Sequence, residues 1–66
     1  MTVKVNGQER TLEREMTVAE FVEQEQYTIT RIAVEINGAI IPKATYSQVI
    51  VQNGDVIEVV SFVGGG

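Results

Sequence analysis

Residues 31–41 have the sequence RIAVEINGAII, which contains the clearest strand pattern in the chain. Within it the β-branched Ile32, Val34 and Ile36 alternate with other side chains, so all three lie on one face of a strand. The Asn-Gly dipeptide that follows is a strong signal for a tight hairpin turn, and the last three residues supply the returning strand. Pro42 ends that strand or confines it to an edge, because proline has no N–H for the ladder.

A second hairpin is predicted at the start of the chain. Val3 and Val5 alternate with polar residues, and Asn-Gly follows at 6–7. Residues 8–12 return as a mostly polar strand with Leu12 turned inward. The charges of this returning segment discourage pairing with other chains, which is typical of an edge strand.

An amphipathic helix is predicted between the two hairpins. Thr17 and Glu20 have the spacing of a capping box, in which each side chain bonds the backbone N–H of the other residue. The apolar residues that share one face of this helix are Val18, Phe21 and Val22. We expect the helix to run to about Gln26. Because so short a helix is unstable alone, it needs a sheet beneath its apolar face.

The last third of the chain is predicted to end in a strand. Residues 43–48 are polar and irregular, with room for one helical turn and with Tyr46 packing inward, and 49–51 form a short apolar piece. A turn at 52–55 leads into the most apolar strand, 56–63, whose alternate side chains face the core.

Two hairpins separated by a helix and followed by a final strand predict the α+β class. The helical connection allows the first and last strands to pair in parallel through a right-handed crossover. We therefore expect a β-grasp, or ubiquitin-like, fold: a mixed sheet of four to five strands with one main helix across one face. Residues 1–63 would form this domain, with the last strand central, and residues 64–66 would form a flexible glycine arm.

Strand alternation predicts which side chains face solvent near the end of the chain. With the valines and isoleucines above in the core, Val60 and Phe62 point outward. Single exposed apolar residues are common, and a local bulge would turn Phe62 into the edge of the core. The interpretation we prefer is a docking patch for a partner protein. Lys4 and Glu58 fall on the same outer face and are predicted to be able to pair.

Composition narrows the range of functions. The chain has 66 residues, with nine acidic and five basic side chains, a net charge of −4, no cysteine and no histidine. This charge disfavours nucleic-acid binding and weakly favours a partner with a positive surface. The composition excludes disulfides, thiol nucleophiles, Ser-His-Asp catalysis and the usual zinc and iron–sulfur ligand sets, so no metal site is expected. With no signal-peptide pattern after Met1 and no long apolar run, we expect a cytoplasmic protein that does not enter a membrane.

The sequence closes on three glycines, Gly64, Gly65 and Gly66. Glycine loses the most conformational freedom on ordering and has no side chain to bury, so this run does not serve the stability of the fold. Either it is an unselected tail, or the carboxylate at its end is the working group, and we favour the second interpretation. The other carboxylates, most simply assigned to solvated faces and to the helix cap, are those of Glu20, Glu23, Glu35 and Glu58.

Taken together, these motifs resemble the sulfur carrier family of thiamin biosynthesis over the whole chain. The resemblance lies in the capping-box helix, in VEINGAIIP at 34–42, in NGDVIEVV at 53–60 and in FVGGG at 62–66. It implies a protein that is a co-substrate, not an enzyme, and that binds no cofactor. In this family an E1-like (ThiF-like) adenylyltransferase uses ATP to adenylate the C-terminal carboxylate, and a sulfur donor such as a cysteine desulfurase supplies sulfur. A ThiG-like thiazole synthase then uses the resulting thiocarboxylate to build the thiazole ring.

The same resemblance implies roles for the last residues. Gly66 carries the carboxylate that is adenylated and thiocarboxylated. The implied partner-binding residues are Gly65, Gly64, Val63, Phe62 and Val60. The nearest alternative is the small subunit of molybdopterin synthase, a sulfur carrier for the molybdenum cofactor, whose tail commonly carries prolines before its glycines. A ubiquitin-like protein modifier and a plain β-grasp binding module are alternatives of other classes.

Overall fold

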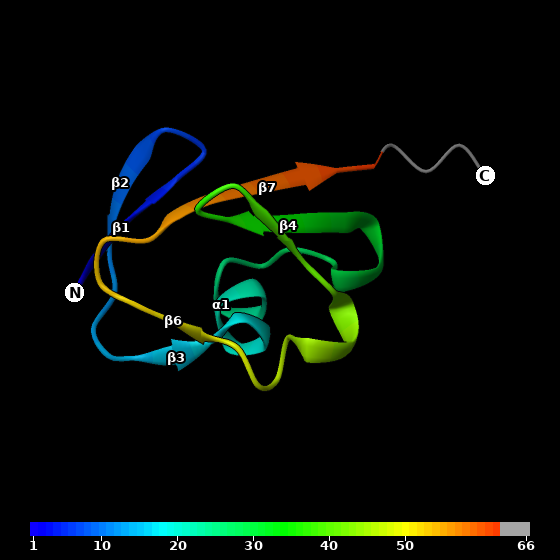
Figure 1. Ribbon diagram of the computed structural model, residues 1–66, viewed down its shortest axis with the longest axis horizontal. Coiled ribbons are helices and arrows are strands. Elements are labelled where there is room, and N and C mark those ends of the chain that lie inside the picture. The colour runs from blue at the N-terminus through cyan, green and yellow to red at the C-terminus, as the bar shows by residue number, and fades with distance from the viewer. Residues whose placement is uncertain (63–66) are drawn as a thin grey trace.

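The computed structural model describes residues 1–62 and contains a five-stranded sheet, a two-stranded sheet and one α-helix (Figure 1). The strands of the larger sheet are β1 (Thr2–Val5), β2 (Gln8–Thr11), β4 (Ile32–Ile36), β5 (Ala39–Ile41) and β7 (Val56–Ser61). The other elements are α1 (Val18–Gln24), β3 (Met16–Thr17) paired with β6 (Ile50–Val51), and two 3-10 turns at Ile29–Arg31 and Lys43–Thr45. A mixed sheet crossed by one helix confirms the predicted α+β, β-grasp class.

The last strand, β7, lies at the centre of the sheet, whose order is β2-β1-β7-β4-β5. It pairs in parallel with β1, where Val5 is opposite Ile57, and antiparallel with β4, where Val34 is opposite Val59. Strand β2 is exposed along its whole length at one edge, as its charges predicted. The end of β7 is therefore held between two neighbouring strands of the domain.

Both Asn-Gly turns form, and their asparagines also hold β7. Asn6 and Asn37 have φ angles of 50° and 53°, and the glycines after them have 83° and 85°. These are the positive angles that a type I′ hairpin turn requires. The Asn6 side chain accepts a hydrogen bond from the Val59 N–H (2.8 Å) and donates one to the Val59 carbonyl (3.2 Å). The Asn37 side chain accepts from the Val56 N–H at 2.9 Å. The two turns thus fix β7 at two points.

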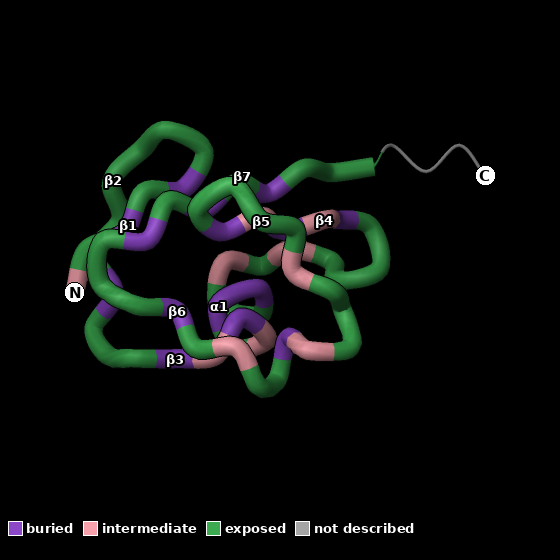
Figure 2. The backbone as a smooth tube through the Cα atoms, viewed as in Figure 1, coloured by how far each residue is buried: buried purple, intermediate pink, exposed green. Residues whose placement is uncertain are grey.

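The core lies between the larger sheet and α1, which runs beneath it in Figure 1 and is purple along its inner side in Figure 2. Val18, Phe21 and Val22 are all buried, as their spacing predicted, and Phe21 is completely so. The buried apolar side chains that surround them are Val3, Val5, Leu12, Met16, Ile32, Val34, Ile36, Tyr46, Val51, Ile57 and Val59.

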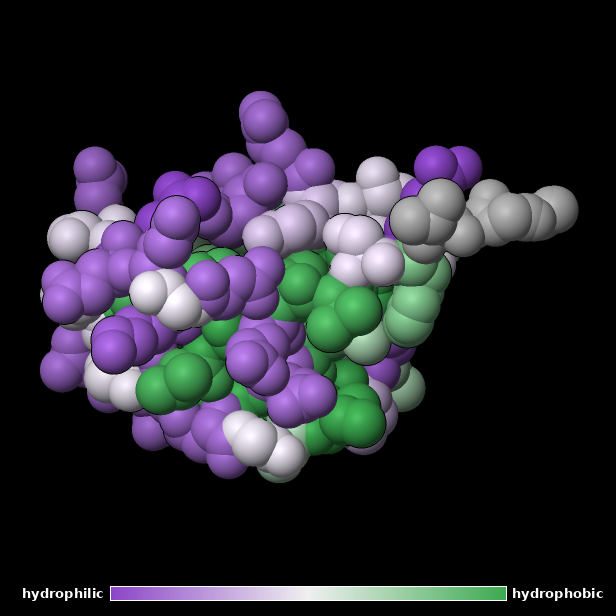
Figure 3. Space-filling view, turned by 90° about the horizontal axis from the view of Figure 1, so that it is seen from above, coloured by the Kyte–Doolittle hydropathy of each residue, from purple (hydrophilic) through white to green (hydrophobic). Residues whose placement is uncertain are grey.

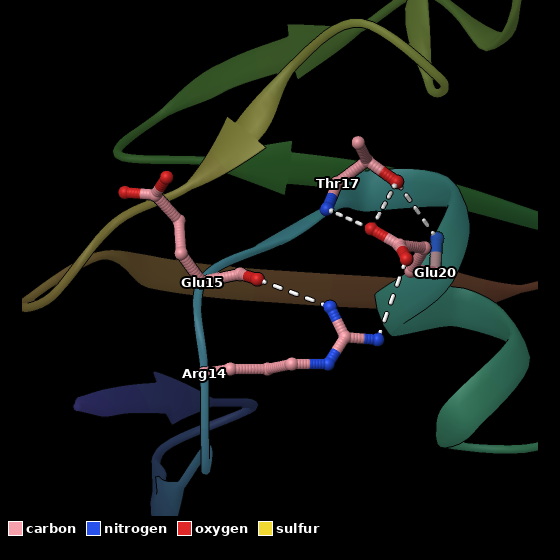
Figure 4. Close-up of polar contacts among 4 residues, drawn as sticks. All are labelled: Arg14, Glu15, Thr17 and Glu20. Atoms are coloured by element: carbon pink, nitrogen blue, oxygen red, sulfur yellow. Dashed lines mark hydrogen bonds and ion pairs between the residues drawn. The ribbon is translucent and has the colours of Figure 1, made fainter.

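The start of α1 is capped in the predicted way (Figure 4). The Glu20 N–H donates to the Thr17 hydroxyl at 3.1 Å, and the Thr17 N–H donates to the Glu20 carboxylate at 2.9 Å. These hydrogen bonds from Thr17, helped by the Arg14 guanidinium 3.4 Å away, lower the pKa of Glu20 below its ordinary value. The N–H groups of Val18 and Ala19 donate to carbonyls in the segment 46–49, so the first turn is fully bonded.

The end of α1 corrects one prediction. The helix stops at Gln24 and does not reach Gln26, because Gln26 adopts a left-handed conformation with φ of 64°. Its N–H donates to the Glu23 carbonyl, and the next N–H, of Tyr27, donates to the Val22 carbonyl. This pair of bonds is a Schellman motif, whose left-handed position is usually a glycine. Glutamine gives no sequence signal for that stop.

Two further features differ from the sequence prediction. The small β3–β6 sheet, which buries Met16 and Val51, was not predicted, because strands of two residues have no periodicity. The predicted Lys4–Glu58 pairing was wrong: the register places Lys4 opposite Val56 on β7 and opposite Glu9 on β2. The stagger between the parallel strands moves Glu58 past Lys4. Within residues 1–62 no helix combines the length and apolarity needed to span a membrane.

Candidate functional site

The candidate site begins where β7 ends. Phe62 follows that strand directly, and its N–H donates to the carbonyl of Arg31 at 2.7 Å. This bond continues the antiparallel register in which Ser61 is opposite Ile32. The chain is therefore guided by β4 up to the last described residue, at the rim of the sheet.

Val60 and Phe62 both face away from the core. Their exposed fractions are 51% and 52%, so Phe62 is not the edge of the core, which was the alternative to a docking role. The ammonium nitrogen of Lys43 lies 5.8 Å from the centroid of the Phe62 ring. This distance is within the range of a cation–π contact, and about half of Phe62 stays accessible beside it.

Strand alternation already places Glu35 and Glu58 on this face with Val60 and Phe62, and the strand register shows that the two glutamates are neighbours and adds Ile40. Glu58 on β7 is directly opposite Glu35 on β4, and Glu35 is opposite Ile40 on β5. Ile40 is the most exposed large apolar side chain of the described residues, at 71%. We call Glu35, Ile40, Glu58, Val60 and Phe62 the outer-face patch. Figure 3, which looks down on the molecule from above Figure 1, shows apolar side chains gathered beside hydrophilic ones near the end of the described chain.

The remaining predicted site residues, Val63, Gly64, Gly65 and Gly66, lie outside the described residues. Among residues 1–62, the structure brings together Val60 and Phe62 and adds the Glu35–Glu58 pair beside them. The two groups of residues 1–62 that have a shifted pKa, Glu20 at the helix start and Tyr46 in the core, lie outside the outer-face patch. No group of three or more acidic side chains of the described chain is arranged to hold a metal ion.

The match to a family model extends over nearly the whole chain. The model of the ThiS family covers residues 3–66. The chain belongs to the ThiS family. This confirms the resemblance based on the capped helix, the Asn-Gly motifs and the glycine end.

Two solved structures share the fold of this ThiS-family chain. The crystal structure of the thiamine biosynthesis protein (ThiS) from Geobacter metallireducens is 28% identical, has a TM-score of 0.86, and matches over 100% of both chains. The NMR solution structure of a thiamine biosynthesis protein from the same organism has a TM-score of 0.83 at 28% identity. That match covers 100% of this chain and 88% of the other.

Two curated relatives are much longer proteins. They are the thiazole synthases of Paramagnetospirillum magneticum and Magnetococcus marinus, which are 41% and 35% identical to this chain over 66 residues. Each match covers 100% of this chain but only 20% of the relative. The ThiS-family chain thus spans about a fifth of the length of these relatives.

Proposed function

We propose that this chain is a sulfur carrier of thiamin biosynthesis and that its working group is the carboxylate of Gly66. The observation that carries the proposal is the family match, which runs through the glycine end of the sequence. The chain serves as a co-substrate in the cytoplasm, and the catalytic groups belong to its partners.

The chemistry requires two displacements, the first at the α-phosphorus of ATP and the second at the carboxyl carbon of Gly66. A C-terminal carboxyl group, with an ordinary pKa of about 3.3–3.7, is ionised at neutral pH and is a poor electrophile. An oxygen of the Gly66 carboxylate first bonds to the α-phosphorus of ATP on an E1-like adenylyltransferase, and pyrophosphate leaves. Sulfur from a donor such as a cysteine desulfurase, where it is held as a persulfide, then bonds to the carbonyl carbon. An external thiol supplies the two electrons that bring this sulfur to the sulfide level and is itself oxidised to a disulfide. AMP leaves with the original oxygen, and a thiocarboxylate remains.

The glycines suit a substrate that must enter a narrow active site. Gly64, Gly65 and Gly66 have no Cβ, and three extended residues reach roughly 10 Å. The folded domain stays outside such a cleft. It docks through Val60 and Phe62, the exposed apolar residues at the end of β7.

Thiazole synthase is the proposed consumer of the thiocarboxylate. Two curated relatives of this chain are thiazole synthases, and each matches the full length of the chain within a longer protein. The presence of a segment similar to this chain within those enzymes supports a functional link between the carrier and thiazole synthase. The carrier would release its sulfur to the forming thiazole ring and return as the carboxylate.

The test is the intact mass of the purified chain after incubation with the adenylyltransferase, ATP and the sulfur donor. We expect the exchange of one oxygen for one sulfur, and no exchange when ATP is omitted. Covalent attachment to another protein would identify a protein modifier. Delivery of the sulfur to molybdopterin synthase and not to thiazole synthase would identify a carrier for the molybdenum cofactor. No mass change with a demonstrably active adenylyltransferase would leave a binding module.

A further inference from the structure

The outer-face patch contains two carboxylates that the fold holds opposite each other. Glu35 and Glu58 are directly paired across the antiparallel β4–β7 ladder on the face away from the core. Directly opposite residues have Cβ atoms about 4.5–5.5 Å apart, and like charges at that spacing destabilise a sheet. The two residues lie in the middle of the sheet, since β7 and β4 are each flanked on both sides by another strand.

No cation among residues 1–62 forms an ion pair with Glu35 or Glu58, although Lys4, opposite Val56 on the same face, is one diagonal step from Glu58. The ion pairs found within residues 1–62 are Arg10–Glu25 and Arg14–Glu20. Lys43, at the far end of β5, lies over the Phe62 ring. The charge of Glu35 and Glu58 is therefore available to a group from outside the chain.

Apolar side chains adjoin the acidic pair on two sides. Ile40 is its neighbour across β4–β5, and Val60 follows Glu58 after a two-residue step of about 7 Å along β7. Phe62 is one further step along, toward the glycine end. An exposed apolar cluster bordered by polar and charged groups is a usual arrangement of a protein docking site.

The charge of the patch discriminates among partners. A second copy of this chain, docked through the same face about a two-fold axis, would bring two acidic pairs together, which costs free energy. Nucleic acid is repelled for the same reason. A protein surface that presents a cation within an apolar rim is complementary, and a guanidinium group is the best fit because its planar fork binds carboxylates through several hydrogen bonds.

We propose that the outer-face patch docks on the adenylating partner and that Glu35 and Glu58 together receive an arginine side chain of that partner. This inference rests on the proposed carrier function and adds to it the residues by which the partner recognises the carrier. The apolar contact is made by Val60, Phe62 and Ile40. The acidic pair fixes the orientation of the docked partner and attracts it during association. The docked domain then directs the end of β7, and the glycines beyond it, toward the partner's active site.

The experiment compares the variant Glu35→Gln/Glu58→Gln with a matched control, Glu13→Gln/Glu23→Gln, which removes the same charge from exposed sites in the bend after β2 and on α1. Stopped-flow association with the adenylyltransferase is measured between low and high salt, and adenylation is followed by pyrophosphate release. We expect the first variant to associate about tenfold more slowly at low salt, with a flatter salt dependence, while the control changes little. The Tm of Glu35→Gln/Glu58→Gln should be unchanged or raised, since glutamine keeps the shape of the side chain and removes the repulsion between the two carboxylates.

Three outcomes would overturn the inference. Equal association of the two double variants would show that the acidic pair is not recognised. If the association rate of the wild-type chain did not depend on salt, that result alone would also show that the acidic pair is not recognised. Concentration-dependent dimerisation of the wild-type chain that is lost in Phe62→Ala would assign the patch to a second copy. Failure of the wild-type chain to be adenylated at all is a separate result, because it overturns the carrier function itself.

Discussion

Tyr46 is the largest fully buried side chain, and within the described structure its hydroxyl has no hydrogen-bond partner. A buried hydroxyl without a partner keeps its desolvation cost, so Tyr46→Phe should leave the free energy of unfolding unchanged or raise it by up to about 1 kcal/mol. Urea unfolding at neutral pH checks this. A loss of more than about 1 kcal/mol would instead show that the hydroxyl bonds a backbone group nearby, such as that of Val34.

The same residue predicts a loss of stability in alkali. Burial raises the pKa of Tyr46, and the nearby backbone of Val34 opposes part of that rise. The folded state therefore holds the phenol proton more tightly than the unfolded state. The associated stability is complete below the pKa of an unfolded tyrosine, about 10, and is lost as pH rises from there through the folded pKa. Tyr46→Phe should remove that part of the alkaline decline, as thermal melts between pH 9 and about 11 will show.

Substitution of Phe62 is expected to affect docking without affecting folding. Because its ring is 52% exposed, Phe62→Ala should lower the free energy of unfolding by less than about 1 kcal/mol, mostly through the lost contact with Lys43. Affinity for the adenylyltransferase should fall by about 2 kcal/mol, or roughly 30-fold, if Phe62 is an interface anchor. Ile29→Ala, at a similarly exposed isoleucine outside the patch, is the control, and its affinity should not change. Unfolding of the Phe62 variant would place that ring in the core.

At the scale of elements, the short helix α1 depends on its cap. Thr17→Ala removes the hydroxyl that accepts the Glu20 N–H and should cost about 1 kcal/mol, whereas Thr17→Ser should restore most of it. Because the cap lowers the pKa of Glu20, its stabilisation is present above the ordinary pKa of a glutamate and is lost as pH falls through the folded pKa. The difference in Tm between wild type and Thr17→Ala should therefore shrink in acid. A pH-independent difference would contradict the role of Glu20.

Elements with local signals were predictable, and those set by distant pairing were not. Two Asn-Gly turns, alternating β-branched residues and a capping box each specify structure within a few positions, so both hairpins and the start of α1 were confirmed. The helix stops at Gln24 because Gln26 is left-handed. The β3–β6 pair consists of strands of only two residues. The neighbours of Lys4 are set by the stagger of β1 against β7. None of these leaves a periodic pattern in the sequence.

The candidate site shows the same division. Strand alternation was enough to place Val60 and Phe62 on the outer face, because alternation is a local property of one strand. The opposition of Glu35 and Glu58 required the register of two strands that are far apart in the sequence. Each glutamate by itself gave no reason to look beyond a solvated surface.

At the scale of the whole molecule, we propose that folding and chemistry belong to different parts of the chain. The core residues lie between Val3 and Val59, so deletion of Gly66 removes none of them. We expect the Tm of the deleted chain to stay within about 2 °C of wild type, while adenylation is abolished. A large drop in Tm would give the last glycine a structural role and weaken the case for a separate working group.

The most direct measurement is fragmentation mass spectrometry of the chain after incubation with its adenylyltransferase, ATP and a sulfur donor. We predict that one oxygen is replaced by sulfur and that the exchange maps to Gly66 alone. The product should lose this sulfur to thiazole synthase. An unmodified Gly66 in the presence of an active adenylyltransferase, or sulfur located at any other residue, would contradict the proposed function.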